Sequence, residues 1–291
     1  MSVRSFIATI SQHDGLNFML TNRIPRRLAT RFMGWFSRIE QPLVRDLSIR
    51  TWQLFCDLDL REAKKSRFTS LRDCFIRELK EGARPLDPEP SSIVSPCDGI
   101  VGACGTVENG KLFQVKGSAY PLAELLGDKQ LAESYRGGPY VTLRLTAGMY
   151  HRFHAPQDCR VDAVTHLWGD TWNVNPPTLA RVKKLYCRNE RAVIQTRLEP
   201  GGERLILVAV AAVLVAGIRL RFLDLVVDPR RSAGSMPVPG KNRLRRGQEM
   251  GWFEHGSTII VLGDRGLSIA NAITTGSTVR MGEALLRRER R

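Results

Sequence analysis

Residues 250–262 read Met-Gly-Trp-Phe-Glu-His-Gly-Ser-Thr-Ile-Ile-Val-Leu, and the change of character in their middle decides how this part of the chain folds. Gly256-Ser257-Thr258 stands between a polar turn and an apolar run that ends at Leu262. Aliphatic and β-branched residues in such a run are typical of a buried strand. We therefore predict a strand over 258–262, preceded by Ser257. Gly256 has no side chain to shield its backbone carbonyl, which is therefore open to attack by a nucleophile.

Similar apolar stretches recur from about Ile93 onward, separated by Gly, Pro and Asp or Asn. They fall at 100–104, 112–115, 140–145, 161–167, 192–196, 205–218 and 258–262. No repeating βαβ rhythm accompanies them, which favours a mainly antiparallel β core. The longest stretch is shorter than the roughly 18–20 apolar residues that cross a bilayer, so we read it as β structure.

The first 80 residues carry a helical pattern. Large apolar residues recur there at a spacing of four, with arginines between them. The apolar positions are Leu16, Leu20, Ile24, Leu28, Phe32 and Phe36. Pro25 interrupts the pattern and predicts two short helices. Two interpretations remain open on the pattern alone: a helix lying in the headgroup layer of a membrane, or an amphipathic helix packed on its own domain.

A further helix is predicted over 70–81. Ser70 and Asp73 have the spacing of a capping box, in which each side chain meets the other residue's backbone N–H. Lys80 suits the negative end of the helix, and Gly82 can adopt the left-handed conformation that follows it. Pro85 then prevents continuation.

These patterns predict an α+β fold in which N-terminal amphipathic helices precede a mainly antiparallel β core. We place the boundary so that residues 1–85 form a helical region and residues 86–291 form a β-rich catalytic domain. The segment 228–248 mixes Pro, Gly, Ser and Asn with Lys and Arg, which is typical of a surface loop. The N-terminus lacks a clean apolar segment before a small-residue cleavage site, so no signal peptide is expected.

The 291-residue chain carries a formal charge of +15. Such an excess of positive charge indicates an anionic partner, either nucleic acid or an anionic membrane surface. The alternative is that the basic side chains only form a solvated surface. No RNA- or DNA-binding signature is present, so nucleic acid is not expected as a partner.

Neither the cysteines nor the histidines indicate a metal site. The chain has six cysteines and no C-x-x-C pair, which favours reduced, mostly buried thiols in a protein that faces the cytosol. His151 and His154 are three residues apart, but no paired cysteines complete a zinc ligand set, so no metal is expected.

Chemically useful residues fall in three separate blocks: Ser95-Pro96-Cys97-Asp98-Gly99, Tyr150 to Pro156, and Gly256-Ser257-Thr258. An aspartate, a histidine and a serine in this arrangement suggest a catalytic set that the fold assembles. Each also has a plain structural interpretation on its residues alone. Asp98 suits a turn, His154 suits a bond to the backbone, and Ser257 suits a hairpin.

Taken together and in order, the motifs closely resemble those of the phosphatidylserine decarboxylase family. The resemblance begins near Arg77-Glu78-Leu79 and extends to the serine block near the C-terminus. Its motifs are Ser95–Gly99, Phe113–Gly117, Tyr150–Pro156, Gly169-Asp170, Val174-Asn175-Pro176, Asn189-Glu190-Arg191, Gly247–Phe253 and Gly256-Ser257-Thr258. One residue departs from the pattern. The family has Leu-Gly-Ser-Thr or Gly-Gly-Ser-Thr at this point, and here His255 precedes the glycine.

The resemblance implies a self-processing enzyme that converts phosphatidylserine to phosphatidylethanolamine and CO₂ through a Schiff base with a covalent pyruvoyl group. Autocatalytic serinolysis at Gly256-Ser257 would generate this cofactor from Ser257 and divide the protein into a β-chain, 1–256, and an α-chain, 257–291. The two chains would remain associated. Family members are often dimers, so a homodimer is an expectation from the resemblance alone.

The resemblance also implies roles for individual residues. His154 would be the base that activates Ser257, and Asp98 would orient His154. His151 would deliver a proton to the substrate's α-carbon. Val174, Asn175 and Pro176 would line the substrate pocket.

The resemblance also favours the membrane interpretation of the N-terminal helices. It implies peripheral association with an anionic phospholipid membrane, on the cytoplasmic face of the cell membrane.

Two other functions remain as alternatives. One is an uncleaved lipid-binding relative without activity, which the unusual His255 motivates. The other keeps the pyruvoyl chemistry but acts on another serine phospholipid or on a soluble amino acid. A soluble substrate would make the basic, apolar N-terminus superfluous.

Overall fold

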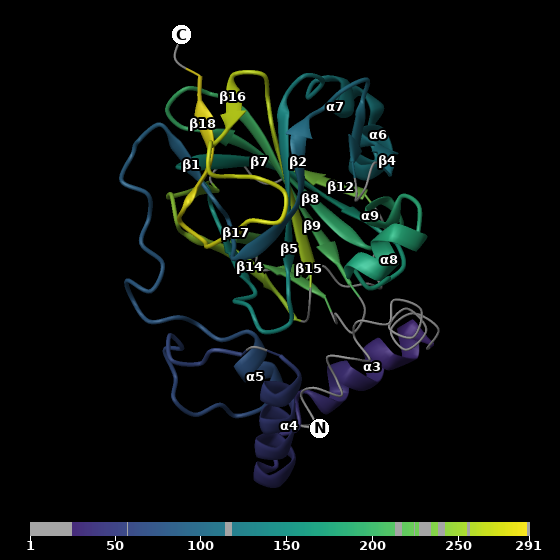
Figure 1. Cartoon of the computed structure of the whole chain (residues 1–291), viewed down its shortest axis with the longest axis vertical. Coiled ribbons are helices and arrows are strands. Elements are labelled where there is room, and N and C mark those ends of the chain that lie inside the picture. The colour runs from purple at the N-terminus through teal and green to yellow at the C-terminus, as the bar shows by residue number, and fades with distance from the viewer. Residues whose placement is uncertain are drawn as a thin grey trace.

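A computed structural model of the chain describes residues 25–56, 58–113, 118–212, 217–223, 225–226, 234–237, 242–254 and 257–289. Three helices gather at one end of the molecule and the β-sheets form the rest (Figure 1). The helices of this end are α3 (Arg26–Phe36), α4 (Pro42–Phe55) and α5 (Leu71–Phe75). Four short helices lie among the strands: α6 (Leu122–Leu126), α7 (Lys129–Glu133), α8 (Pro176–Arg181) and α9 (Leu185–Arg188). A 3₁₀ turn, η1, covers Arg221–Leu223.

Eighteen strands lie within the described residues. In chain order the first nine are β1 (Ser92–Val94), β2 (Gly99–Thr106), β3 (Lys111–Phe113), β4 (Ala119–Pro121), β5 (Pro139–Leu145), β6 (Arg152–His154), β7 (Cys159–Leu167), β8 (Arg191–Leu198) and β9 (Arg204–Ala211). The others are β10 (Ile218–Leu220), β11 (Leu225–Val226), β12 (Gly234–Pro237), β13 (Arg243–Leu244), β14 (Glu249–Phe253), β15 (Ser257–Gly263), β16 (Leu267–Ile269), β17 (Thr278–Val279) and β18 (Ala284–Arg288).

The largest sheet runs in the order β12-β7-β8-β9-β15-β5-β2-β17, with β13 also pairing with β7. Smaller sheets have the orders β11-β10-β14-β6, β1-β18-β16 and β3-β4. Every pairing between these strands is antiparallel. The predicted α+β class with a mainly antiparallel core is therefore confirmed, and each predicted strand that lies within the described residues is present.

The strand predicted from the opening motif lies in the middle of the largest sheet. β15 pairs with β9 on one side and β5 on the other, and all seven of its residues are buried. Ser257 begins this strand, opposite Leu145 of β5 and Ala211 of β9. The aliphatic run from Ile259 to Leu262 is buried on both faces of the sheet, so the serine before it enters the core with the strand.

The helical end has a small hydrophobic cluster of its own. Ala63, Phe68 and Cys74 are buried there, and Ile49 and Trp52 of α4 pack against them. Pro25 immediately precedes α3 and Pro42 is the first residue of α4, both of which suit a helix start. The apolar positions expected before Pro25, which include Leu16, Leu20 and Ile24, lie outside the described residues. None of the described helices is both long enough and apolar enough to span a bilayer.

The predicted helix over 70–81 is wrong in length. Its start is right, because Ser70 accepts a hydrogen bond from the backbone N–H of Asp73. The helix ends at Phe75 because the following residues pair instead with an extended segment. Lys64 donates its backbone N–H to Glu78, and Lys80 donates to Glu62.

The loop predicted over 228–248 is also partly wrong. β12 and β13 fall within it, and both pair with β7 at the edge of the largest sheet. Pro237 within β12 is compatible with an edge strand. Proline has no backbone N–H, and the outer side of an edge strand has no neighbouring carbonyl that needs one. The other residues of the segment that the structure describes lead from β13 into β14.

Candidate active site

Ser257 is fully buried at the entrance of β15. Its hydroxyl oxygen has no hydrogen-bond partner within the part of the chain that the structure describes. A buried hydroxyl without a partner needs an explanation, and a catalytic role is one of the recognised explanations. The two residues before it, His255 and Gly256, lie outside the described residues, while Glu254 directly follows the end of β14. The bond at Gly256-Ser257 therefore belongs to a short link between two strands of different sheets.

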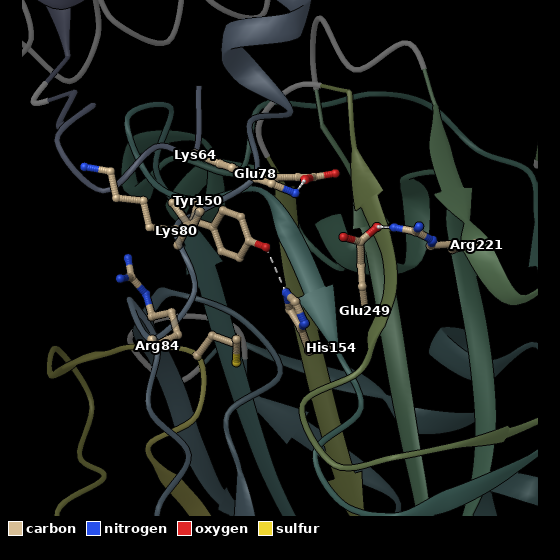
Figure 2. A pocket seen from close by; sticks show the side chains of 11 residues that line it. Lys64, Glu78, Lys80, Arg84, Tyr150, His154, Arg221 and Glu249 are labelled. Carbon is tan, nitrogen blue, oxygen red and sulfur yellow. Dashed lines mark hydrogen bonds and ion pairs between the residues drawn. The ribbon is translucent and has the colours of Figure 1, made fainter. Parts of the chain in front are cut away.

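His154 ends β6 and is held by both of its ring nitrogens. Nδ1 lies 2.9 Å from the carbonyl oxygen of Gly247, and Nε2 lies 2.9 Å from the hydroxyl of Tyr150 (Figure 2). Because a carbonyl can only accept, Nδ1 carries the proton, and Nε2 of the neutral ring accepts from Tyr150. Burial lowers the pKa of His154 below its ordinary value of 6.5, although the Gly247 carbonyl opposes this shift. The imidazole is therefore a neutral base at neutral pH.

His151 lies one residue before β6 and is fully buried. Its Nδ1 lies 2.9 Å from the carbonyl oxygen of Met149. Its ring centroid is 4.0 Å from that of Phe75, so the helical end of the molecule covers this imidazole. The two histidines thus have different environments: His154 lines a cavity, and His151 is packed beneath α5.

Asp98 lies just before β2, and its carboxylate is held by Arg84. The two Arg84–Asp98 hydrogen bonds measure 2.9 and 2.6 Å, and Asp98 also accepts the backbone N–H of Met281 at 2.9 Å. Its charge favours the protonated form of His154 electrostatically. Among the described residues, no hydrogen bond joins the side chains of Asp98 and His154. Their hydrogen bonds connect Asp98 to Arg84 and Met281, and His154 to Tyr150 and Gly247.

A cavity of about 440 Å³ opens beside His154. Cationic side chains from the helical end and from η1 surround it together with two acidic ones (Figure 2). The charged lining residues are Lys64, Glu78, Lys80, Arg84, Arg221 and Glu249. A second cavity of about 190 Å³ is lined by Asp98, Arg77 and Arg84, among others, and Tyr150 lines both. Tyr150 and Arg84 thus lie between the region of His154 and that of Asp98.

Val174, Asn175 and Pro176 line neither of these two cavities. Val174 is buried in the main core. Asn175 caps α8, because its side chain accepts the backbone N–H of Thr178 at 3.1 Å, and Pro176 is the first residue of that helix. The described contacts of Asn175 and Pro176 are those of a helix start.

Two groups of residues around the site were not identified from the sequence. Arg84 was not identified as a site residue, although it holds Asp98. Glu254, three residues before Ser257, is 1% exposed and contacts Arg72, Arg219 and Arg38 at 2.6, 3.2 and 3.6 Å. The signal available in the sequence was a glutamate directly after an apolar stretch. A carboxylate buried there requires charged partners.

Comparison with known proteins identifies one family. A family model described as phosphatidylserine decarboxylase matches residues 71–287. A phosphatidylserine decarboxylase proenzyme of Pseudomonas fluorescens is 35% identical over 271 residues, which cover 90% of this chain and 93% of that protein. The proenzymes of Pseudomonas aeruginosa and Haemophilus influenzae are 35% and 32% identical over 275 and 270 residues, covering 90% of this chain and 93% and 92% of their own lengths.

Proposed function

This chain belongs to the phosphatidylserine decarboxylase family, and from that premise we propose how its residues convert phosphatidylserine to phosphatidylethanolamine and CO₂. The matched region contains Asp98, His151, His154 and Ser257. The observation that carries the proposal is Ser257 itself, a fully buried serine at the entrance of a central strand whose hydroxyl has no partner among the described residues.

The first reaction is self-cleavage between Gly256 and Ser257. The Ser257 hydroxyl oxygen attacks the Gly256 carbonyl carbon, the peptide C–N bond breaks and an ester forms. Elimination then removes the proton from Cα of residue 257 and breaks the bond between Cβ and the ester oxygen, which forms the Cα=Cβ double bond and releases Gly256 as the carboxyl end of the β-chain. The dehydroalanine left at 257 takes up water and loses ammonia, leaving a pyruvoyl group at the start of the α-chain. Conversion of this side chain removes a hydroxyl that makes no described hydrogen bond, so the site suits the group.

His154 is assigned as the base for this cleavage. A serine hydroxyl is a weak nucleophile at its ordinary pKa and needs a neighbouring base. The lowered pKa of His154 keeps its imidazole neutral, and the Nδ1 bond to Gly247 leaves Nε2 as the basic atom. Asp98 contributes its negative charge, which favours the imidazolium formed when His154 takes the proton. Arg84 holds that carboxylate in place.

His151 is assigned as the acid for decarboxylation. The pyruvoyl group, when formed, supplies the electron sink that the loss of a carboxyl group from an α-amino acid requires. The chain must then return a proton to the substrate's α-carbon, and an imidazole suits proton transfer near neutral pH. The Met149 carbonyl fixes the proton of the neutral ring on Nδ1, so Nε2 is the atom that exchanges a proton with the substrate.

The helical end is proposed to contact the membrane. Leu28, Phe32 and Trp35 of α3 are all more than half exposed and recur at helical spacing. Leu43, Leu47 and Leu54 do the same on α4, with 77, 68 and 51% exposure. Two exposed apolar stripes on neighbouring helices suit insertion into the headgroup layer. The positive charge of the chain then favours an anionic, cytoplasm-facing lipid surface.

We also propose that the two chains stay associated after cleavage, which the strand pairing supports. β15 lies between β9 and β5, and β18 pairs with β1, so the α-chain shares two sheets with the β-chain. We retain residues 1–85 as the membrane-contacting region and 86–291 as the catalytic domain. The pocket role of Val174, Asn175 and Pro176 stays a prediction, since these residues line neither of the two cavities described above.

Intact mass spectrometry of the purified protein, with Ser257→Ala as the control, tests the proposal. Wild type should give two fragments split at Gly256-Ser257, with the smaller one lighter by one ammonia than simple hydrolysis would leave it. CO₂ release from phosphatidylserine vesicles should accompany the cut. An intact chain that binds anionic vesicles without releasing CO₂ would instead support the lipid-binding alternative, and activity on free serine would support a soluble substrate.

A further inference from the structure

Arg77 is a buried arginine that the proposed chemistry does not use. It follows α5, has 5% exposure, and reaches across to the turn that precedes His151. Its Nη2 donates to the carbonyl oxygen of Gly148 at 2.9 Å and to that of Met149 at 3.2 Å. The segments that it joins lie about seventy residues apart in the chain.

The Met149 carbonyl is also the partner of His151, whose Nδ1 lies 2.9 Å from the same oxygen. Arg77 and His151 therefore share one acceptor. A carbonyl oxygen that accepts from a guanidinium on one side can rotate little, so the bond from His151 has a fixed direction. The guanidinium keeps its protons at any accessible pH, so it remains a donor to this oxygen alongside the imidazole N–H.

The residues beside Arg77 bind the same turn. The ring of Phe75 lies on the imidazole of His151, and the carbonyl of Ile76 accepts a hydrogen bond of 2.9 Å from Arg152. Three successive residues after the start of α5 thus contact the region around His151. Phe75 restricts the tilt of the ring, and Arg77 restricts the acceptor to which the ring bonds.

An ordinary structural role explains Arg77 less well. Burial lowers its pKa, and its Nε and Nη1 have no hydrogen-bond partner among the described residues. Arg77 forms no ion pair within the described part of the chain either. Burying a guanidinium that satisfies two backbone carbonyls and leaves two of its nitrogens without a described partner is a poor way to stabilise a fold.

We propose that Arg77 is a positioning residue for decarboxylation, which fixes His151 in the Nδ1–H tautomer by holding the Met149 carbonyl. Nε2 is then the ring atom that transfers the proton. Arg77 lines the second cavity with Asp98, but its described hydrogen bonds go to the carbonyls of Gly148 and Met149, so the effect proposed here passes through His151. This inference rests on the proposed role of His151, and it predicts that decarboxylation depends on Arg77 while self-cleavage, which uses His154, does not.

The test compares Arg77→Lys and Arg77→Met with wild type and with Arg204→Lys. Arg204 also donates to a backbone carbonyl, that of Ser134, but it stands at the opposite end of β9 from the residue that pairs with Ser257. Three quantities are measured on each purified protein: the fraction cleaved, kcat and KM for phosphatidylserine in mixed micelles, and the imidazole ¹⁵N spectrum. The chain has only five histidines, so His151→Gln assigns the signal of His151.

Both Arg77 variants should be cleaved to the wild-type extent, with KM within about twofold and kcat reduced about tenfold or more. The His151 signal should change from one Nδ1–H tautomer to a mixture. Arg204→Lys should match wild type in all three measurements. Unchanged kcat and an unchanged His151 signal in Arg77→Lys would overturn the proposal, as would equal losses of cleavage and decarboxylation.

The same spectra separate this inference from the proposed function. A wild-type protein that neither cuts itself nor releases CO₂ would refute the function, but its His151 signal would still report whether Arg77 fixes the tautomer. If Arg77→Met does not fold, Arg77→Lys retains the charge and the stem length, and its spectrum decides the question.

Discussion

The hydroxyl of Tyr150 donates a hydrogen bond of 2.9 Å to Nε2 of His154, whose Nδ1 is bonded to the Gly247 carbonyl. Burial raises the pKa of Tyr150, so this hydroxyl remains a donor throughout the pH range of interest. The contact therefore stabilises the neutral imidazole and covers the atom to which we assign the role of base in self-cleavage. His154 and Tyr150 together determine when the ring acts as a base.

Replacement of His154 should stop self-cleavage. We expect His154→Ala to reduce the first-order cleavage rate by roughly 10²–10⁴-fold, the usual contribution of a positioned general base. His151→Ala is the matched control, because it removes the neighbouring imidazole and should still allow cleavage while abolishing CO₂ release. Gel analysis of freshly synthesised protein measures both rates. A fully processed His154→Ala protein would remove His154 from the role of base.

The pH dependence of cleavage should reflect the lowered pKa of His154. A base works when it is deprotonated, and burial shifts this boundary to below the ordinary value of 6.5. The cleavage rate should therefore stay constant from neutral pH down past 6.5 and fall only in more acidic buffer. Refolded uncut protein, sampled over time at a series of pH values, gives the profile. A midpoint above 6.5 would contradict the assignment.

Replacement of Tyr150 should move that midpoint. A hydrogen bond to the neutral form of a base lowers its pKa, so its loss in Tyr150→Phe should raise the pKa of His154. The cleavage profile would then begin to fall at higher pH, while the Gly247 bond still holds the ring. Tyr135→Phe removes another buried tyrosine hydroxyl, beside Arg204, and should leave the profile where it is in wild type. Coincident profiles for all three proteins would show that Tyr150 does not tune His154.

The apolar stripe on α4 should contribute directly to membrane binding. Burying each leucine is worth about 1.5–3 kcal/mol, so Leu43→Ser combined with Leu47→Ser should weaken binding to anionic vesicles by at least about tenfold. Sedimentation with vesicles containing phosphatidylglycerol measures the change. Phe113→Ser alters an exposed apolar residue of β3, whose partner strand β4 lies away from the helical end (Figure 1). Equal losses for the two proteins would indicate nonspecific adsorption.

Local patterns in the sequence predicted most of the fold. The aliphatic run after Ser257 determined the central strand, and Ser70 marked a helix start. The end of that helix could not be predicted, because Glu78 and Lys80 pair with residues near 62–64 that no local signal connects to them. The edge strands β12 and β13 were missed because their residues resemble a loop until β7 supplies hydrogen bonds.

The candidate site was only partly predictable for the same reason. Motifs identified Asp98, His154 and Ser257, but the partners of these residues depend on the tertiary fold. Arg84 holds Asp98, and Tyr150 rather than Asp98 is bonded to His154. Periodicity and composition contain no information about such contacts, because a hydrogen bond between distant segments produces no regular pattern of residues in the sequence.

Glu254 joins the helical end to the strand that leads to the cleavage site. Its carboxylate accepts from Arg72 of α5 and Arg219 of β10, and Arg38 lies nearby after α3. Burial alone would raise the pKa of Glu254, but the hydrogen bond from Arg72 and the charges of the three arginines hold it below its ordinary value of 4.5. The stabilisation from a depressed carboxyl pKa is present above 4.5 and is lost as the pH falls through the folded-state value.

Glu254→Gln should therefore loosen the helical end. Loss of these charge-assisted hydrogen bonds should cost about 2 kcal/mol, which would raise amide hydrogen exchange in α3 and α5 by more than tenfold at pH 7. Glu133→Gln breaks the exposed pair with Arg136, which is worth little, and should leave exchange unchanged. Because the contribution of Glu254 requires its charge, amide hydrogen exchange in wild type and in Glu254→Gln should become equal at a pH well below 4.5. Equal exchange in wild type and Glu254→Gln at pH 7 would mean that the apolar contacts of α4 and α5, rather than this carboxylate, hold the helical end in place.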